Sequence, residues 1–179
     1  MKREDLTQEY LKECLDYNKD TGIFTWKHRP LSHFNTLRSC NASNTKCAGK
    51  KAGAQHKNQY VRIEINSIPY RAHRLAWFYE YGIWPVEDID HIDTVKYHNW
   101  ITNLREATNA ENGQNRVKAK IDNKSTGLLG VRPVMGSKTF YAQITINKKK
   151  LHLGCFKTPE LAHEAYVKAK REIHPFGTL

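Results

Sequence analysis

The chain has 179 residues, of which 39% are hydrophobic, and its formal net charge is +11. This composition predicts a globular protein with one medium core or two small ones, and it excludes fibrous and low-complexity classes. The longest apolar runs, such as residues 74–84, are broken by charge and are far shorter than the ~20 residues that span a bilayer. Residues 1–22 lack the apolar core of a signal peptide, so we expect a cytoplasmic protein with no membrane partner.

Positive charge is concentrated in the last third of the chain. Residues 1–123 carry 19 basic and 15 acidic side chains, whereas residues 124–179 carry 10 and 3. A cationic surface of this kind raises the local concentration of polyanions, and nucleic acid is the usual partner. The charge alone therefore favours nucleic acid as the partner, and a basic solvated face without such a role is the alternative.

The cysteines favour reduced thiols. They are scattered through the chain without CxxC spacing: Cys14, Cys40, Cys47 and Cys155. This pattern argues against a secreted disulfide framework and a zinc knuckle. A zinc site from His28, His33, Cys40 and Cys47 is a minor alternative, because the six-residue gap between the two cysteines is unlike the usual ligand spacing.

The first half of the chain predicts short helices and hairpins. In chain order we expect a threonine-capped amphipathic helix at 7–18, a strand at 21–26, a hairpin at 60–72 with "NS" as its turn, and a helix at 73–82. The helix should stop at Gly82 and Pro85. Residues 28–58 are rich in Asn, Ser, Lys and Gly, and we expect them to be the least structured part.

The next segment, "DIDHID" at residues 88–93, places three aspartates and a histidine in six positions of a basic chain. We expect a strand here, then a loop at 94–98, a second strand at 99–104, and a helix from about residue 106 to 120 that holds Asn112. Such a concentration of acid suggests that a cation is held there against an anion.

Strand geometry separates the roles of the two central residues of this segment. Neighbouring side chains alternate faces, so Asp90 and His91 cannot act as a simple bidentate pair. Asp90 could reach a hard divalent cation through oxygen, while His91 could act as a base, since an imidazole titrates near neutrality. Asn112 could supply the second protein oxygen, because Mg²⁺ takes only one or two such ligands. Asn103 could orient the histidine ring.

These residues resemble a known family. "DHID" followed by "NWITNLREATNAENGQN" is similar to the HNH nucleases of the ββα-metal fold, specifically the phage homing endonuclease branch. The upstream segments "YNKDTGIFTWK", "AGKKAG", "YVRIEI" and "YRAHRLAWFYEYGIWP" resemble the module that precedes the motif in that branch. The resemblance covers roughly residues 7–118.

The resemblance implies a mechanism with named residues. His91 would be the general base that activates water, and Asp90 and Asn112 would bind Mg²⁺ or Mn²⁺. Asn103, twelve positions after His91, would orient the imidazole. The metal would bridge the scissile phosphate and stabilise the departing 3′ oxygen. Asn115, one helical turn after Asn112, is the rival metal ligand.

The loop departs from the family pattern. Where the family commonly has D-N-R, this chain has His98, Asn99 and Trp100. These residues lie outside the four catalytic positions, so the departure concerns the hydrogen bonds of the loop and its DNA contacts. We expect His98 to be a surface residue or a phosphate contact.

The C-terminal segment predicts a second domain. Residues 126–156 are expected to form three strands, and residues 158–177 an amphipathic helix with Pro159 in its first turn. The pieces "GVR", "YAQI", "LGCF", "TPELAHEAY" and "HPFG" resemble the apetala-two or ethylene-response-factor type of DNA-binding domain, which occurs appended to HNH homing enzymes. The resemblance implies that the sheet enters the major groove.

Alternation along these strands separates a core face from a DNA face. Ala142 and Ile144 would pack on the helix. The candidate DNA contacts on the other face are Arg132, Tyr141, Gln143, Thr145, Lys150 and His152. Arginine and glutamine can read base edges, whereas lysine mainly contacts phosphate. The tryptophans and most arginines of the plant domains are missing from this face, so their base preference does not transfer.

Other conspicuous residues have structural interpretations. We expect His73 and Arg74 to lie outside the site, because they stand near a helix start. The aromatic residues with the spacing of buried faces are expected in the core: Tyr60, Tyr70, Trp77, Phe78 and Trp84.

Together these patterns predict an α+β protein. An HNH endonuclease module at residues 1–120, with its ββα-metal motif at about 86–118, would precede an apetala-two-like domain at 121–179, a three-stranded antiparallel sheet packed on one helix. The expected function is metal-dependent cleavage of double-stranded DNA, with phage homing at an extended site as the biology and the host cytoplasm as the location. No small-molecule cofactor is expected.

Two alternatives stay open. The chain could be a sequence-specific DNA-binding regulator with a decayed nuclease centre, or a restriction-like enzyme that makes double-strand breaks as a dimer. Whether the protein is a monomer or a dimer also stays open.

Overall fold

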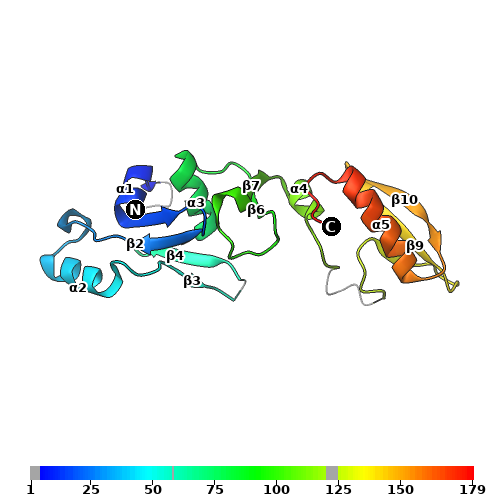
Figure 1. The fold of residues 1–179 in the computed structure, drawn as a ribbon, viewed down its shortest axis with the longest axis horizontal. Coiled ribbons are helices and arrows are strands. Elements are labelled where there is room, and N and C mark those ends of the chain that lie inside the picture. Colours follow the sequence, from blue (N-terminus) through cyan, green and yellow to red (C-terminus); the bar gives the residue numbers. More distant parts are fainter. Residues whose placement is uncertain (1–4, 58, 120–124) are drawn as a thin grey trace. The chain divides into compact units, whose positions relative to one another are not determined.

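The computed structural model describes residues 5–57, 59–119 and 125–179. The fold is α+β, as expected, with short helices and four small antiparallel sheets in these ranges. The chain divides into two compact units, Met1–Ala107 and Thr108–Leu179 (Figure 1). The expected domain boundary between residues 120 and 121 lies outside the described residues. Within the described ranges, no helix is both long and apolar enough to cross a membrane.

The first unit contains a hairpin, a three-stranded sheet and a second hairpin around helix α3. Its elements are α1 (Gln8–Cys14), β1 (Leu15–Asn18), β2 (Ile23–Trp26), η2 (Leu31–His33), α2 (Leu37–Cys47), β3 (Ala54–Gln55), β4 (Val61–Ile65), β5 (Ile68–Arg71), α3 (Ala72–Tyr81), β6 (Asp88–His91), η3 (Ile101–Asn103) and β7 (Leu104–Ala107). The strand orders are β1–β2, β3–β4–β5 and β6–β7.

The first helix is shorter than expected. The hydroxyl of Thr7 accepts the Tyr10 N–H at 3.2 Å, which confirms the threonine cap. The helix ends at Cys14, however, and Leu15–Asn18 pairs with β2 as a strand. Burial alternates along this strand, with Leu15 and Tyr17 inside. The expected helix at 7–18 was wrong in its second half, because Leu15–Asn18 has the period of two that is typical of a strand.

Residues 28–57 are more ordered than expected, since they contain η2, α2 and β3. Thr36 caps α2 by accepting the Ser39 N–H at 3.1 Å. Buried Asn44 binds the backbone of Arg29 twice, accepting from its N–H at 3.0 Å and donating to its carbonyl at 2.9 Å. The composition of these residues is typical of a loop, but they form a helix. The Thr36 cap and the hydrogen bonds between Asn44 and Arg29 provide partners for backbone groups that would otherwise have none.

The central hairpin and helix confirm the prediction. Asn66 and Ser67 form the turn between β4 and β5 with φ of 50° and 63°, the conformation that a two-residue hairpin turn requires. Helix α3 ends at Gly82, whose φ is 72°. The core around α3 includes the following buried side chains: Leu11, Leu15, Phe24, Ile63, Ile65, Tyr70, Leu75 and Phe78. Trp77 and Trp84 pack partly buried against this core.

The β6–β7 hairpin differs from the expected one. Strand β6 pairs with β7, which is Leu104–Ala107 rather than residues 99–104. Residues 101–103 form a 3₁₀ turn, and the Ile101 N–H donates to the carbonyl of Lys19 at 3.0 Å. Because the loop is tied to the β1–β2 turn in this way, pairing with β6 starts only at Leu104.

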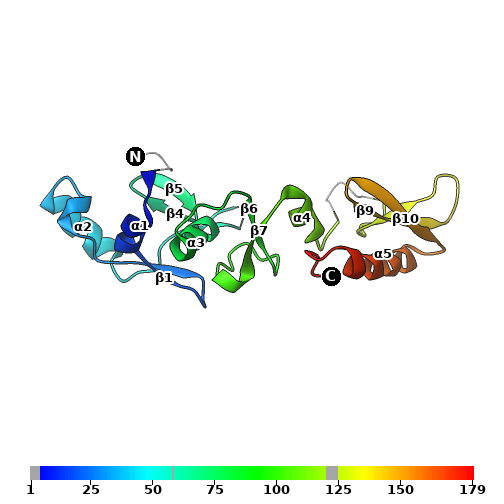
Figure 2. The same ribbon diagram turned by 90° about the horizontal axis from the view of Figure 1, so that it is seen from above.

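The second unit is a sheet covered by one helix. Its elements are α4 (Asn109–Gln114), β8 (Val131–Pro133), β9 (Phe140–Ile146), β10 (Lys149–Phe156) and α5 (Pro159–Ile173). The sheet order is β10–β9–β8, and α5 lies across one of its faces (Figures 1 and 2). Its core is formed by Val131, Ala142, Ile144, Ala162 and Tyr166. Thr158 caps α5 and Pro159 is in its first turn, which confirms the prediction.

Helix α4 is shorter than the expected helix at about 106–120. It begins with a capping box, in which the side chains of Thr108 and Glu111 each bind the other's backbone N–H. It ends at Asn115, whose N–H bonds back to Asn112.

Candidate catalytic and DNA-binding sites

Strand β6 positions both central residues of the candidate active site. Asp90 and His91 are buried, with exposed fractions of 6% and 4%. Opposite Asp90 on β7 stands Arg105, whose Nη2 and Nε donate to Asp90 Oδ2 at 2.8 and 3.1 Å. This cross-strand ion pair fixes the orientation of the carboxylate.

Asn99 binds the imidazole of His91. The distance from His91 Nε2 to Asn99 Oδ1 is 3.2 Å, and Asn99 Nδ2 donates to the Tyr97 carbonyl at 3.2 Å. Because the amide nitrogen faces that carbonyl, its oxygen faces His91, so Nε2 carries the proton and Nδ1 carries the lone pair. Burial, the largest cause, lowers the pKa of His91, and the bond to Asn99 only partly opposes this. The imidazole is therefore neutral near pH 7, as a general base must be.

The β1–β2 hairpin contacts the backbone of Asn99 and helps to fix its position. The hydroxyl of buried Tyr17 donates to the Asn99 carbonyl at 2.6 Å. Gly22, in the turn, has φ of +70°, and a Cβ there would lie 2.3 Å from the carbonyl carbon of Asn99. The position of Asn99 thus depends on a hairpin about eighty residues earlier in the chain.

Asn103 orders the loop rather than the ring. Its side chain accepts the Asp93 N–H at 3.0 Å and donates to Asp93 Oδ1 and the His98 carbonyl, both at 2.9 Å. The His91 ring is bound by Asn99 Oδ1, and the expected orientation of the imidazole by Asn103 stays a prediction. Its role in the site is therefore indirect, through the loop that carries Asn99.

His98 pairs with Asp93 at the mouth of this loop. The distance from its Nδ1 to Asp93 Oδ2 is 2.6 Å, and its side chain is 33% exposed. Burial alone would raise the pKa of Asp93, but hydrogen bonds from His98, Asn103 and the Val95 N–H lower it below its ordinary value. His98 is thus partly exposed, as expected, and also closes the loop.

Two residues expected to be structural lie beside His91. The ring centroids of His73 and Tyr60 are 5.1 and 6.0 Å from that of His91. His73 Nδ1 is buried and has no hydrogen-bond partner among the described residues. Burial, followed by the charges of His91, Arg71 and Arg74, lowers the pKa of His73 to about 3. Sequence spacing gives no signal for this contact, because the rings come from different elements.

Both candidate second metal ligands belong to the second unit. Asn115 is buried, and its Oδ1 accepts from the Thr178 hydroxyl at 2.8 Å, whereas Asn112 is partly exposed on α4. The bond to Thr178 engages the oxygen that Asn115 would offer, which favours Asn112 between these rivals. The pairing of Asn112 with Asp90 stays a prediction.

The donor types fit a hard divalent ion. Asp90 offers carboxylate oxygen and Asn112 amide oxygen, which Mg²⁺ accepts alongside water and phosphate. In the described ranges, no three His, Cys, Asp or Glu residues gather in a group that could hold a metal, and this includes the His and Cys residues at 28–47 considered for zinc. The proposed pair, Asp90 and Asn112, contains only one residue of these four types, so it would not form a group of three.

The six candidate DNA contacts lie on one face of the C-terminal sheet. Directly opposed residues of antiparallel strands share a face, and the register opposes Arg132 to Tyr141, Gln143 to His152, and Thr145 to Lys150. Ala142 and Ile144, which alternate with these residues, are buried against α5. The sheet thus presents arginine, glutamine and lysine on the side away from its helix.

Comparison with known proteins gives one family match. Residues 70–114 match the family model described as HNH endonuclease. The matched segment covers 45 of the 179 residues. The match therefore indicates an HNH endonuclease domain within the chain and does not describe the rest of it. The matched segment contains Asp90, His91, Asn99, Asn103 and Asn112, whereas Asn115 lies just beyond it. No curated protein and no solved structure matches the chain.

Proposed function

We propose that the protein is a metal-dependent DNA endonuclease in which His91 is the general base. The HNH domain at residues 70–114 supports a nuclease that acts on DNA. The observation that carries the proposal is the setting of His91, which is buried, has its Nε2 3.2 Å from Asn99 Oδ1, and has a pKa lowered by burial. An imidazole in this state can accept a proton from water.

Different residues of the chain are proposed to have different roles in phosphodiester hydrolysis. His91 Nδ1 takes the proton of the attacking water, and Asn99 keeps the ring in that orientation throughout. Asp90 and Asn112 are proposed to hold a divalent ion, Mg²⁺ or Mn²⁺, which would supply electrostatic stabilisation to the departing oxygen. Asn103 is proposed to act as a positioning residue, because it fixes the loop that carries Asn99.

The C-terminal sheet is proposed to bind duplex DNA through the face of its six candidate contacts. Arg132 and Gln143 are suited to base edges and Lys150 to phosphate. This role follows the resemblance to apetala-two-type domains and agrees with the side chains that the face presents. An added recognition domain would extend the site, as homing requires.

A second candidate function is a DNA-binding regulator with a decayed nuclease centre. The Asp90–Arg105 ion pair favours it, because the guanidinium occupies a carboxylate oxygen that a metal would use. Under this alternative the C-terminal sheet would bind DNA without cleavage. A restriction-like dimer shares the chemistry of the main proposal, and gel filtration with the ratio of nicked to linear plasmid would separate it.

Cleavage of supercoiled plasmid and phage genomic DNA tests the proposal. Wild type and His91→Ala are each incubated with Mg²⁺, Mn²⁺ or EDTA, and DNA binding is measured in parallel. We expect metal-dependent nicking or cutting by wild type that is lost in His91→Ala while binding persists. Specific binding without cleavage by wild type in either metal would instead favour the regulator.

A further inference from the structure

The first unit separates its charges along the chain. Residues 27–57 carry 7 basic side chains and no acidic one, whereas the remainder of residues 1–107 carries 9 basic and 13 acidic ones. The segment is therefore +7 and its surroundings in the unit are −4. The net charge of residues 1–107 taken together does not reveal this cationic segment.

The segment is held in a defined structure. Asn44 clamps α2 to the backbone of Arg29, as described above. After α2, the chain runs beside β2, where the Trp26 N–H donates to the Lys50 carbonyl at 2.9 Å and Lys51 forms a bridge with Thr25. The backbone at Lys50 and Lys51 is thus fixed to the sheet rather than carried on a loose loop.

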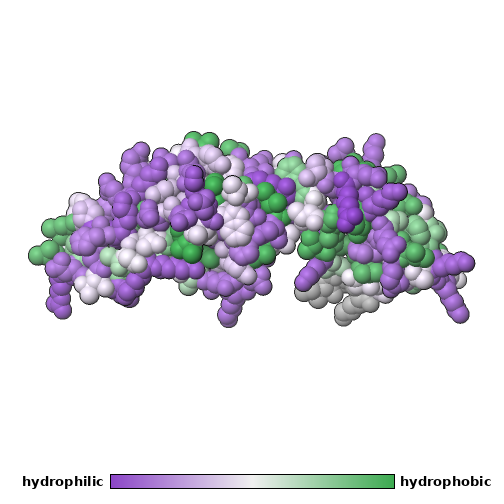
Figure 3. All heavy atoms as spheres, in the orientation of Figure 1, coloured by the Kyte–Doolittle hydropathy of each residue, from purple (hydrophilic) through white to green (hydrophobic). Residues whose placement is uncertain are grey.

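Most of its cations lack a counter-charge. Five are exposed and make no ion pair or side-chain hydrogen bond in the described part of the chain: Arg38, Lys46, Lys50, Lys51 and Lys57. The other two are engaged. Lys27 donates to the Lys12 carbonyl, and Arg29 lies over the rings of Trp26 and Phe34 while donating to Ser43. Figure 3 shows hydrophilic side chains protruding at the α2 end of this unit.

We propose that residues 27–57, the basic segment, form a second DNA-contact surface that binds phosphates of the duplex. Exposed cations without partners repel one another, and a polyanion with one charge per ~1.7 Å of axis relieves that repulsion. Exposed hydroxyl and amide side chains of α2, among them Asn41 and Thr45, add neutral donors suited to phosphate oxygens. The surface rests on the proposed function, and it places a DNA contact within the unit that carries His91.

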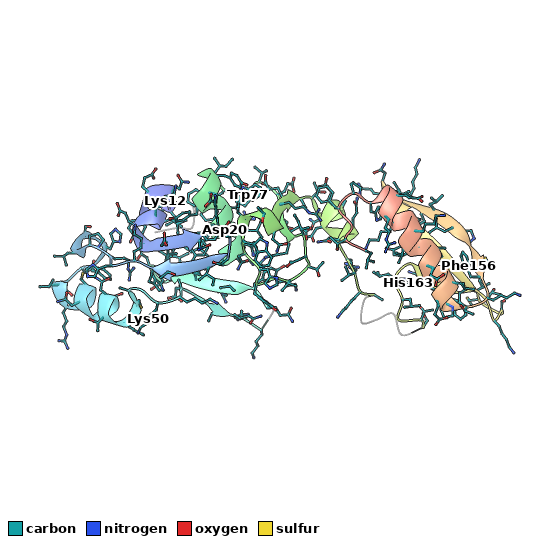
Figure 4. The ribbon with its side chains drawn as sticks, viewed as in Figure 1. Lys12, Asp20, Lys50, Trp77, Phe156 and His163 are labelled. Atoms are coloured by element: carbon teal, nitrogen blue, oxygen red, sulfur yellow. The ribbon has the colours of Figure 1, made fainter. Side chains whose placement is uncertain are left out.

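The test compares two charge-matched double variants of the full chain. Lys50→Gln/Lys51→Gln removes two cations of the basic segment, and Lys12→Gln/Lys19→Gln removes two exposed cations elsewhere in the first unit. Figure 4 labels Lys12 on α1 and Lys50 just beyond α2, near the upper and lower edges of the first unit in that view. Binding of a short fluorescent duplex of arbitrary sequence is measured over a series of potassium chloride concentrations, alongside plasmid cleavage in Mg²⁺ and Mn²⁺.

We expect the Lys50/Lys51 variant to bind at least about threefold more weakly and to reduce the log–log salt slope by about 2, since each phosphate contact contributes ~0.9. The Lys12/Lys19 variant should stay close to wild type. If the two variants have the same affinity for the duplex and the same salt slope, the proposed DNA-contact surface is wrong, even if wild type cleaves DNA. If the salt slope falls only in the Lys50/Lys51 variant and wild type does not cleave DNA, the DNA-contact surface is supported and the proposed nuclease activity is rejected.

Discussion

The side-chain amide of Asn99 contributes to the state of His91. Asn99 accepts from Nε2 and is itself oriented by the Tyr97 carbonyl, so its removal frees the ring to rotate and to exchange tautomers. We expect Asn99→Ala to lower the single-turnover cleavage rate by about 10- to 100-fold, the usual effect of losing such a supporting partner. Asn99→Asp keeps the acceptor and should retain more activity than Asn99→Ala.

This prediction is checked with DNA saturating, so that binding does not limit the rate. Duplex affinity should be the same for all three proteins, because Asn99 is buried. A wild-type rate in Asn99→Ala would contradict the role given to this residue.

The buried imidazole of His73 should make folding pH-dependent. Its pKa is about 3 in the folded protein against an ordinary 6.5, so below pH 6.5 the unfolded chain binds a proton that the folded chain does not. Stability is therefore full above pH 6.5 and falls as the pH drops from 6.5 towards 3, by up to about 1.4 kcal/mol per pH unit from this group. His73→Phe should flatten that fall, measured as the urea midpoint between pH 7.5 and 5.

An exposed histidine provides the control for this measurement. His56→Gln should keep the wild-type dependence on pH, since His56 is exposed. If His73→Phe shows the same fall as wild type, burial of a neutral His73 is not its cause.

At the scale of elements, the β1–β2 turn should be the most sensitive part of the site's support. Gly22→Ala adds a Cβ 2.3 Å from the Asn99 backbone at a φ of +70°. Gly49→Ala has a similar φ of +74° but meets nothing within 4 Å, so it isolates the backbone strain. Strain alone is worth about 1 kcal/mol, and we expect Gly22→Ala to lose clearly more stability and to cleave more slowly.

Thermal and urea unfolding of both variants provide the measurement. Equal destabilisation by Gly22→Ala and Gly49→Ala would mean that the turn does not press on Asn99. The expected difference would instead link the N-terminal hairpin to the geometry of the active site.

The elements also show which features the sequence could predict. The "NS" turn, the stop at Gly82 and the cap of α5 were predictable because each depends on residues within one turn of the chain. Helix α2 was missed because Asn44 gains its partner fifteen residues away. Asn99 was missed for the same reason: a β6 histidine, a loop amide and the Tyr17 hydroxyl meet only in the folded unit.

At the scale of the whole molecule, the two units carry surfaces of different chemistry. The face of the C-terminal sheet has arginine and glutamine as well as lysine, whereas the basic segment has mainly lysine. Base readout is therefore expected from the sheet and phosphate binding from both. With about six to eight phosphate contacts in total, the log–log salt slope of binding should be near −5 to −7.

Substitutions on the sheet should separate these two kinds of contact. Arg132→Ala is expected to relax base preference at one position, with a cost of about 1 to 3 kcal/mol on the preferred sequence. Lys150→Ala should weaken binding to all sequences alike and reduce the slope by about 1. Selection from a randomised duplex library, followed by salt titration, measures both; equal loss of preference in the two variants would contradict the assignment.

The central claim is that the imidazole of His91 removes the proton from the attacking water. Chemical rescue tests it most directly, because His91→Gly deletes the ring and leaves space for free imidazole while Asp90 and Asn99 stay in place. We predict that metal-dependent cleavage is lost in His91→Gly and is restored by added imidazole in proportion to its concentration. Cleavage by His91→Gly at the wild-type rate without imidazole would contradict the account.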